Sequence, residues 1–156
     1  MRVQLHWEYE TISRGANSIY KQLEAEPSIE NPYDYIKFYG LRTHGVLNET
    51  PVTEMVYVHS KLMIVDDDVV IMGSANINDR SMVGRCDSEI AMVVRDSDKV
   101  QTTMNGQEME VGKFARSLRL NIFGILSGFE EDSRLIDPLD DSFKEIWENT
   151  AYRNTA

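Results

Sequence analysis

The sequence has 156 residues, of which 42% are hydrophobic, and it carries a formal net charge of −10. This length and composition allow one domain with a buried core, and they exclude a collagen, a disulfide-rich scaffold and a disordered chain. The negative charge argues against a nucleic-acid-binding protein, because affinity for polyphosphates comes largely from lysine and arginine.

The cellular setting is indicated by the cysteine content and by the apolar segments. The single cysteine, Cys86, cannot form an internal disulfide, and the first residues lack the apolar core of a signal peptide. Apolar runs such as residues 69–72 fall far short of the roughly 20 residues that cross a bilayer. We therefore expect a reducing, cytoplasmic setting, in which any contact with a membrane is peripheral.

In the first part of the chain, apolar residues at helical spacing predict a helix over about residues 12–25, which Pro27 follows. Aromatic and branched residues over 33–41 predict a strand that enters a turn-like segment, Gly40–Gly45.

The centre of the chain is predicted to be mostly strand. Residues 55–65, 69–73 and 88–95 are rich in Val, Ile and Met, and the acidic turn Asp66–Asp68 separates the first two segments. Near-continuous apolar strands imply burial on both faces of a sheet.

Two helices are predicted in the last part. Helical spacing covers residues 111–126, and Gly128 is placed to end that helix. Ser142 and Glu145 form a capping-box pattern at the start of a terminal helix. We expect an α/β fold, in which a mixed β-sheet is flanked by helices, and one lobe spanning residues 1–156.

The segment that contains His59 and Lys61 combines an imidazole and an ammonium group. Side chains alternate between the faces of a strand, so the two share a face, with Cα atoms roughly 7 Å apart. After the next strand, Ser74 and Asn76 also share a face, and Gly73 permits close approach of the backbone.

These residue types suit phosphodiester chemistry. A histidine can attack phosphorus or exchange a proton near neutral pH, a lysine can hold a phosphate, and a carboxylate such as Glu89 can orient the imidazole. Asp66–Asp68 lacks the spacing of a calcium loop, H-x-K is not a zinc pattern, and Gly73–Ile77 lacks the second glycine of a serine-hydrolase elbow. We expect no catalytic metal and no cofactor for catalysis.

The same residues resemble the phospholipase D superfamily. Every position of its H-x-K-x4-D-x6-G-S-x-N pattern is filled, by His59, Lys61, Asp66, Gly73, Ser74 and Asn76. Flanks such as Gly40–His44, Ile77–Met82 and Asp87–Glu89 resemble eukaryotic phospholipase D, and Cys86 departs from the basic residue expected there. The resemblance implies a phospholipase D-like α-β-α sandwich and the C-terminal catalytic half of such an enzyme.

The resemblance also implies a role for each residue. In that family two copies of the motif meet: one histidine forms a phosphohistidine, and the other protonates the leaving alcohol and then activates water. With one copy here, His59 would be the general acid and base. Lys61 and Asn76 would bind phosphate oxygens, Ser74 would support them, and Glu89 would hold the His59 ring. Asp66 completes the catalytic motif, but it is out of phase with His59, so we expect a structural role for it.

The implied activity is hydrolysis of phosphatidylcholine-like lipids at a membrane surface to phosphatidic acid and a free headgroup, with transfer to alcohols as a side reaction. The implied partner is the first His-Lys-Asp lobe, in the same full-length chain or in a second subunit. Activation by phosphoinositides and small GTPases would act through domains that this sequence lacks.

Two alternatives remain. A one-motif phosphodiesterase or nuclease could complete its site as a homodimer, although the charge disfavours nucleic acid. An inactive fragment could bind partners through the acidic residues 130–141, which we otherwise interpret as a solvated loop.

Overall fold

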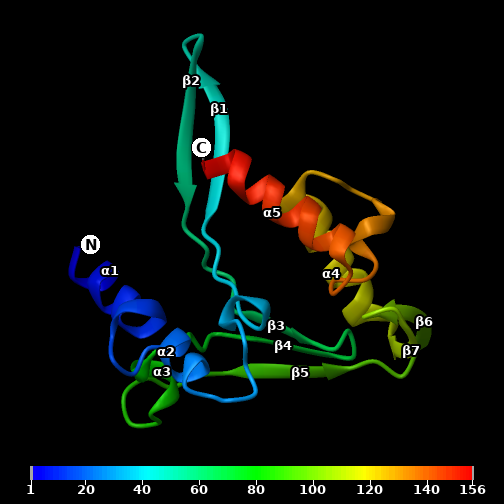
Figure 1. Cartoon of the computed structure of the whole chain (residues 1–156), viewed down its shortest axis with the longest axis horizontal. Coiled ribbons are helices and arrows are strands. Elements are labelled where there is room, and N and C mark those ends of the chain that lie inside the picture. The colour runs from blue at the N-terminus through cyan, green and yellow to red at the C-terminus, as the bar shows by residue number, and fades with distance from the viewer. Residues whose placement is uncertain (1, 156) are drawn as a thin grey trace. The chain divides into compact units, whose positions relative to one another are not determined.

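A computed structural model describes residues 2–155 of the chain (Figure 1). It contains two compact units, of which the first ends at Leu41 and the second begins at Arg42. The first unit is helical, and the second combines helices with three small sheets.

The elements of the first unit are α1 (Arg2–Tyr9), a π-helical turn (Glu10–Arg14), α2 (Ile19–Glu24) and a 3-10 turn (Pro32–Asp34). The single helix predicted over residues 12–25 is wrong in its extent, because the backbone is extended at Gly15 (φ −68°, ψ 154°). A new helix starts after Ser18, whose hydroxyl accepts a hydrogen bond from the backbone N–H of Lys21 (3.4 Å).

The strand predicted from residue 33 to residue 41 is also wrong. Pro32 begins a 3-10 turn there, and the Asn31 side chain caps it. The aromatic side chains pack locally instead: the buried Tyr20 ring lies 4.6 Å from the Tyr33 ring and 5.9 Å from the Phe38 ring, between centroids. Tyr33 and Phe38 remain 55% and 44% exposed, so they cover the buried Tyr20 ring rather than form one face of a sheet.

The second unit opens with a hairpin of β1 (Leu41–Leu47) and β2 (Thr50–Val56). Asn48 and Glu49 both have positive φ (49° and 64°), as in the two-residue turns that match the twist of paired strands. The turn predicted at residues 40–45 is therefore mostly strand. All residues of the hairpin except Leu41 are exposed.

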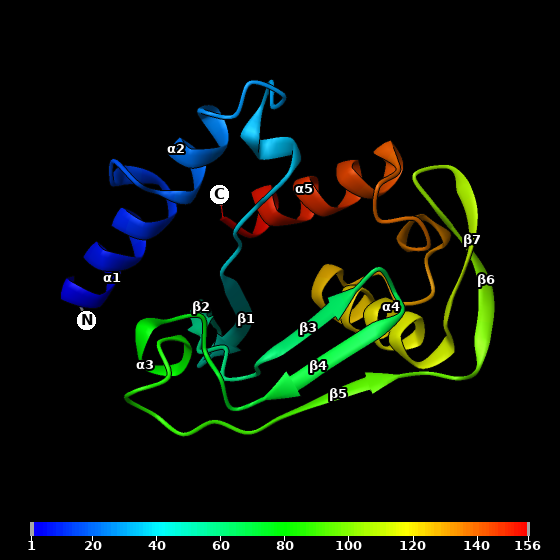
Figure 2. The same ribbon diagram turned by 90° about the horizontal axis from the view of Figure 1, so that it is seen from below.

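The central sheet consists of β3 (Leu62–Val65), β4 (Val69–Gly73) and β5 (Ala91–Arg95), in that order and antiparallel throughout (Figure 2). The strand over residues 69–73 and the acidic turn before it are confirmed. The strand predicted over residues 55–65 is divided between β2 and β3, and the one predicted from residue 88 starts at Ala91.

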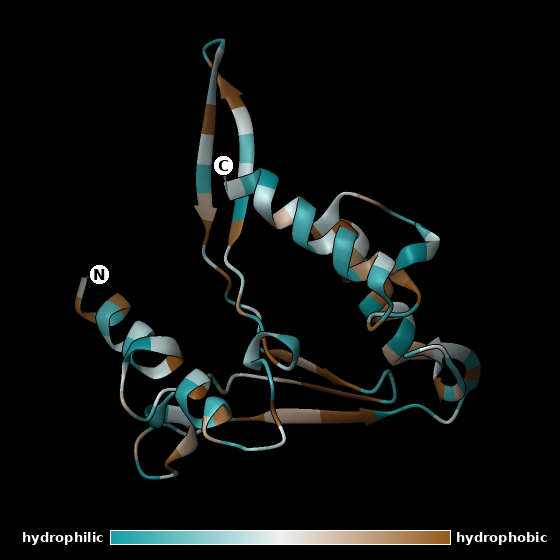
Figure 3. Ribbon diagram, in the orientation of Figure 1, coloured by the Kyte–Doolittle hydropathy of each residue, from teal (hydrophilic) through white to brown (hydrophobic). Residues whose placement is uncertain are grey.

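The two faces of the central sheet differ in burial. On one face, Val70 is fully buried, and its partners Ile64 and Val94 are half-buried. On the other face, Met63 and Val93 are 51% and 60% exposed. Hydrophobic colours run along this sheet in Figure 3. The expected burial of both faces is therefore not met within residues 2–155.

A second hairpin, which was not predicted from the sequence, follows the central sheet. It consists of β6 (Lys99–Met104) and β7 (Gln107–Gly112). Its turn residues Asn105 and Gly106 have positive φ (54° and 72°). The backbone N–H groups of both donate to the Asp137 carboxylate (2.9 Å each), so one member of the acidic segment holds this turn.

Both predicted helices of the last part are confirmed, as α4 (Lys113–Ser127) and α5 (Asp141–Thr155). Gly128 ends α4 in the left-handed conformation (φ 75°). The predicted capping box is wrong, because α5 begins one residue before Ser142. The carboxylate of Asp140 takes the capping position and accepts the backbone N–H of Ser142 at 2.8 Å.

A buried ion pair joins the β3–β4 turn to α4. Asp67 and Arg119 are 2% and 6% exposed, and two hydrogen bonds of 2.7 Å link the carboxylate to the guanidinium group. Arg119 also donates to the backbone carbonyls of Leu135 and Ile136 (2.7 and 2.8 Å). The turn, the helix and the segment that follows the helix are thereby fastened together.

The α/β class is confirmed. The strands form three separate sheets of two, three and two strands, rather than the single mixed sheet that we expected. Tight turns between β1 and β2, β3 and β4, and β6 and β7 favour such local pairs. In the described part of the chain, no helix has both the length and the apolar character needed to cross a membrane.

Candidate active site

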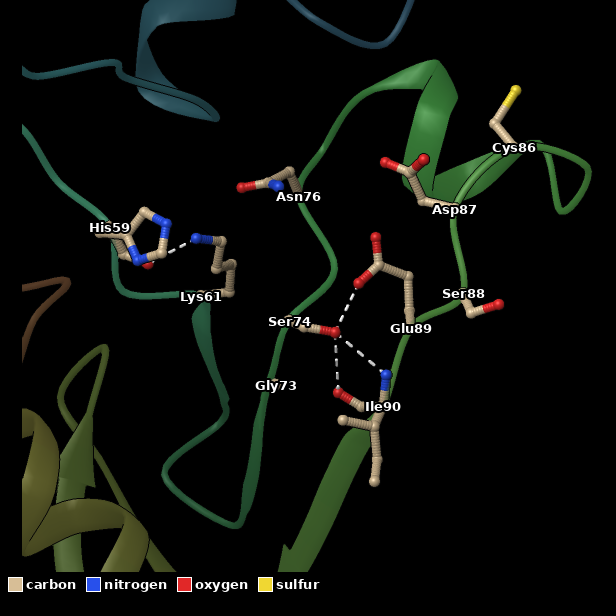
Figure 4. Close-up of a pocket in the computed structure, with 10 residues that line it drawn as sticks. All are labelled: His59, Lys61, Gly73, Ser74, Asn76, Cys86, Asp87, Ser88, Glu89 and Ile90. Atoms are coloured by element: carbon tan, nitrogen blue, oxygen red, sulfur yellow. Dashed lines mark hydrogen bonds between the residues drawn. The ribbon is translucent and has the colours of Figure 1, made fainter.

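The candidate side chains gather at one edge of the central sheet. His59 and Lys61 precede β3, Ser74 and Asn76 follow β4, and Glu89 precedes β5. These strand ends meet because neighbouring strands run in opposite directions. The pocket is lined by His59, Lys61, Gly73, Ser74, Asn76, Cys86, Asp87, Ser88, Glu89 and Ile90 (Figure 4).

The His59–Lys61 segment lies just outside β3, although a strand was predicted there. The Lys61 carbonyl still accepts the backbone N–H of Gly73 (3.2 Å), and both side chains line the pocket as the alternation predicts. The Lys61 ammonium group donates to the carbonyl oxygen of His59 (2.7 Å). The His59 ring stacks on Tyr57, with centroids 6.1 Å apart.

The close approach predicted at Gly73 is confirmed. A Cβ atom at this position would lie 2.3 Å from the carbonyl oxygen of Ile90 and 2.7 Å from the Cα of Ala91. No side chain fits at such distances, so glycine allows β4 and β5 to meet directly beneath the pocket.

Ser74 links the ends of β4 and β5. Its hydroxyl donates to the Glu89 carboxylate (2.5 Å) and accepts the backbone N–H of Ile90 (3.0 Å). Hydrogen bonds from Ser74 and then Ser81 lower the pKa of Glu89, and the positive charge of Lys61 acts in the same direction. Glu89 is therefore an anion in the pocket near neutral pH.

The interpretation that Glu89 holds the His59 ring differs from what the structure shows. Within residues 2–155, no hydrogen bond joins the two side chains, and Figure 4 shows the Glu89 carboxylate directed at Ser74. The strand order explains this contact, because β4 lies between β3 and β5 and brings Ser74 closer to Glu89. The two residues share the pocket without touching.

The loop between β4 and β5 contains α3 (Asp79–Met82). The Asn78 side chain caps this turn by accepting the N–H of Ser81 (3.1 Å), and the Ser81 hydroxyl accepts the backbone N–H of Asn76 (3.1 Å). Arg80 and Asp87 form a two-point ion pair at 2.9 and 3.0 Å. None of these contacts was predicted from the sequence, although the preference for asparagine at a helix N-cap could have revealed the first.

Asp66 is not brought into the pocket. It lies exposed in the β3–β4 turn with φ 51°, at the far end of β3 from Lys61. The structural contact expected of it is made by its neighbour Asp67, which is buried against Arg119. No local pattern could reveal that pair, because its members are far apart in sequence.

Several potential metal ligands line the pocket, among them Cys86, whose thiol is free and exposed. Among residues 2–155, however, no three His, Cys, Asp or Glu side chains are grouped so as to hold an ion. The pocket offers an imidazole, an ammonium group, a hydroxyl and an amide, which together suit a phosphate group.

Comparison with known proteins decides the family. The family model described as Phospholipase D matches residues 49–140, which include every pocket residue. The chain belongs to the phospholipase D family.

Three similar proteins show the breadth of this family. The chain is 51% identical to human phospholipase D1 and 48% identical to Arabidopsis thaliana phospholipase D zeta 1, over 96% and 99% of its length. It is 50% identical to Dictyostelium discoideum phospholipase D A over 76% of its length. It spans only 14%, 14% and 10% of these relatives. The resemblance to eukaryotic phospholipase D is confirmed, and the chain corresponds to one part of such a protein.

Proposed function

We propose that this chain supplies the second catalytic half of a phospholipase D that hydrolyses phosphatidylcholine-like phosphodiesters to phosphatidic acid and a free headgroup. The observation that carries the proposal is the convergence of His59, Lys61 and Asn76 on one pocket. The names of the similar proteins supply the substrate class.

The proposed reaction has two steps. A histidine of the first half attacks phosphorus and forms a P–N bond, while the headgroup alcohol leaves with a proton from His59. His59 then takes a proton from water, and the oxygen of that water attacks phosphorus as the P–N bond breaks. An alcohol in place of water gives transfer of the phosphatidyl group to that alcohol.

The remaining pocket residues bind and orient the phosphate. Lys61 and Asn76 contact its nonbridging oxygens, where a positive charge and an amide N–H stabilise the charge that develops. Ser74 keeps the ends of β4 and β5 in register by bonding the Glu89 carboxylate and the backbone N–H of Ile90. No cofactor is required in this scheme.

The partner in the scheme is the first His-Lys-Asp lobe, since this chain contains one copy of the motif. The exposed apolar face of the central sheet, with Met63 and Val93, supports a partner of substantial area. Contact with membranes is peripheral and cytoplasmic, and phosphoinositides or small GTPases would act through other domains.

A second candidate is a phosphodiesterase that completes its site as a homodimer. The single motif favours it, because two copies related by a two-fold axis would also bring two histidines together. The net charge of −10 disfavours nucleic acid as its substrate.

Complementation tests the proposal. We expect the chain alone to release little phosphatidic acid from phosphatidylcholine vesicles, and a mixture with the first half to be active. His59→Ala should lower the activity of the mixture by about 100-fold or more. His44→Ala is the matched control, because His44 lies on the β1–β2 hairpin and contacts Thr53. Full activity of a monomeric sample of the chain alone would contradict the proposal, and activity of a dimer alone would favour the second candidate.

A further inference from the structure

The loop between β4 and β5 has two limbs, and each carries a residue of the proposed site. Asn76 lies on the first limb and Glu89 on the second, just before β5. Ser81 lies in the turn α3 between them. Its oxygen accepts the backbone N–H of Asn76 at 3.1 Å. Its hydroxyl also lies where it can donate a hydrogen bond to the Glu89 carboxylate.

The hydrogen-bonding capacity of serine matches this pair of contacts. A hydroxyl has one proton to donate and two lone pairs that accept, so it can serve Glu89 and Asn76 at once. Alanine could serve neither, and threonine could serve both.

Other contacts hold Ser81 in place. Its backbone N–H is bonded to the Asn78 side chain (3.1 Å), and its neighbour Arg80 is paired with Asp87 on the second limb. A backbone hydrogen bond from Asp87 to the carbonyl of Arg80 (3.1 Å) closes the loop further. The hydroxyl is therefore presented from a fixed turn.

We propose that Ser81 is a positioning residue of the phosphodiester reaction, whose hydroxyl ties the Asn76 backbone to the Glu89 carboxylate and so fixes the two limbs around the phosphate. The inference rests on the proposed function, because it takes the pocket to be the place of that reaction. Ser81 acts through Asn76 and Glu89 and does not line the pocket itself.

The charge of Glu89 provides a readout that is independent of turnover. Its pKa is lowered by hydrogen bonds from Ser74 and then Ser81, whereas the nearby Asp87 raises it and Lys61 lowers it further. His59 faces the same pocket and adds a positive charge when protonated. Removal of the Ser81 hydroxyl should therefore raise the pKa of Glu89.

The experiment compares Ser81→Ala, Ser81→Thr and the control Ser117→Ala. Ser117 is an exposed serine on α4 whose hydroxyl donates to the carbonyl of Phe114. The kcat and KM of each variant are measured with the first half, per folded molecule. The titration of Glu89 is followed by carbon NMR of the chain. We expect Ser81→Ala to lower kcat about tenfold, with a smaller change in KM, because a hydrogen bond to a charged group is lost.

Threonine should restore both the rate and the Glu89 titration, and Ser117→Ala should change neither. An unchanged kcat in folded Ser81→Ala, or a loss of stability alone, would overturn the inference. If no preparation turns over, the proposed function has failed, and the Glu89 titration still decides whether Ser81 holds that carboxylate. If the pKa of Glu89 is unchanged in Ser81→Ala, that result alone would overturn the proposed contact between Ser81 and Glu89.

Discussion

Replacement of Asp67 by asparagine should destabilise the second unit strongly. Asparagine preserves the shape of the side chain and tolerates the positive φ of 53° at this turn position, so the change removes mainly the charge. Arg119 would remain 6% exposed without its carboxylate partner. Breaking a buried ion pair from one side typically costs about 3–5 kcal/mol.

For a domain of this size, that cost corresponds to a fall in Tm of roughly 6–20 °C, at about 2–4 °C per kcal/mol. Thermal and urea unfolding, followed by circular dichroism at pH 7, would measure it. Asp66→Asn is the matched control, because Asp66 lies in the same turn but is exposed, and it should change stability by less than about 0.5 kcal/mol.

A double variant sharpens this test. The loss of stability in Asp67→Asn is expected to come from a buried guanidinium group that has no carboxylate partner. Replacing Arg119 by methionine in the same chain should then recover part of the lost free energy of unfolding, and the effects of the two substitutions should not add. Equal stability losses for Asp66→Asn and Asp67→Asn, or fully additive costs for Asp67 and Arg119, would refute the role given to this ion pair.

Two further predictions concern the acidic segment. Asp140→Ala should cost about 1 kcal/mol by removing the cap of α5, whereas Asp141→Ala, in the exposed first turn of that helix, should cost less; urea unfolding would show the difference. Hydrogen bonds from Arg134 lower the pKa of Asp132 to about 2, so the contact stabilises the fold above the usual aspartate pKa and is lost as the pH falls toward 2. In Arg134→Gln, NMR should find Asp132 titrating closer to its usual value, and an unchanged titration would contradict the assignment.

The site was more predictable than the fold around it, for a physical reason. His59 and Lys61 lie outside β3, but the Lys61 carbonyl still pairs with the backbone N–H of Gly73, and both side chains line the pocket as the predicted alternation required. Ser74 was selected because it shares a strand face with Asn76, and Glu89 because a carboxylate can orient an imidazole. Their direct contact depends on the order of the strands, which no local pattern encodes.

Two errors in the predicted fold have different physical causes. Tyr33 and Phe38 suggested a strand by composition, but they pack on Tyr20. The β6–β7 hairpin was missed because its strands are polar, although the Asn105–Gly106 dipeptide is a strong hairpin signal.

The acidic segment shows a similar limit of local reasoning. It was interpreted as a solvated loop, yet Asp137 accepts hydrogen bonds from the β6–β7 turn and Asp140 caps α5. Burial raises the pKa of Asp137, but its backbone hydrogen bonds outweigh that effect and lower it. These carboxylates organise the fold around them.

The stereochemical course at phosphorus tests the central claim most directly, namely that His59 serves a phosphohistidine formed on the other half. A phosphatidylcholine analogue made chiral at phosphorus would be turned over by the reconstituted enzyme in the presence of a primary alcohol, and the configuration of the phosphatidyl alcohol would be determined. Two in-line displacements each invert the centre, so the account predicts net retention. Net inversion would mean a single direct attack by the acceptor, and it would contradict the two-histidine mechanism.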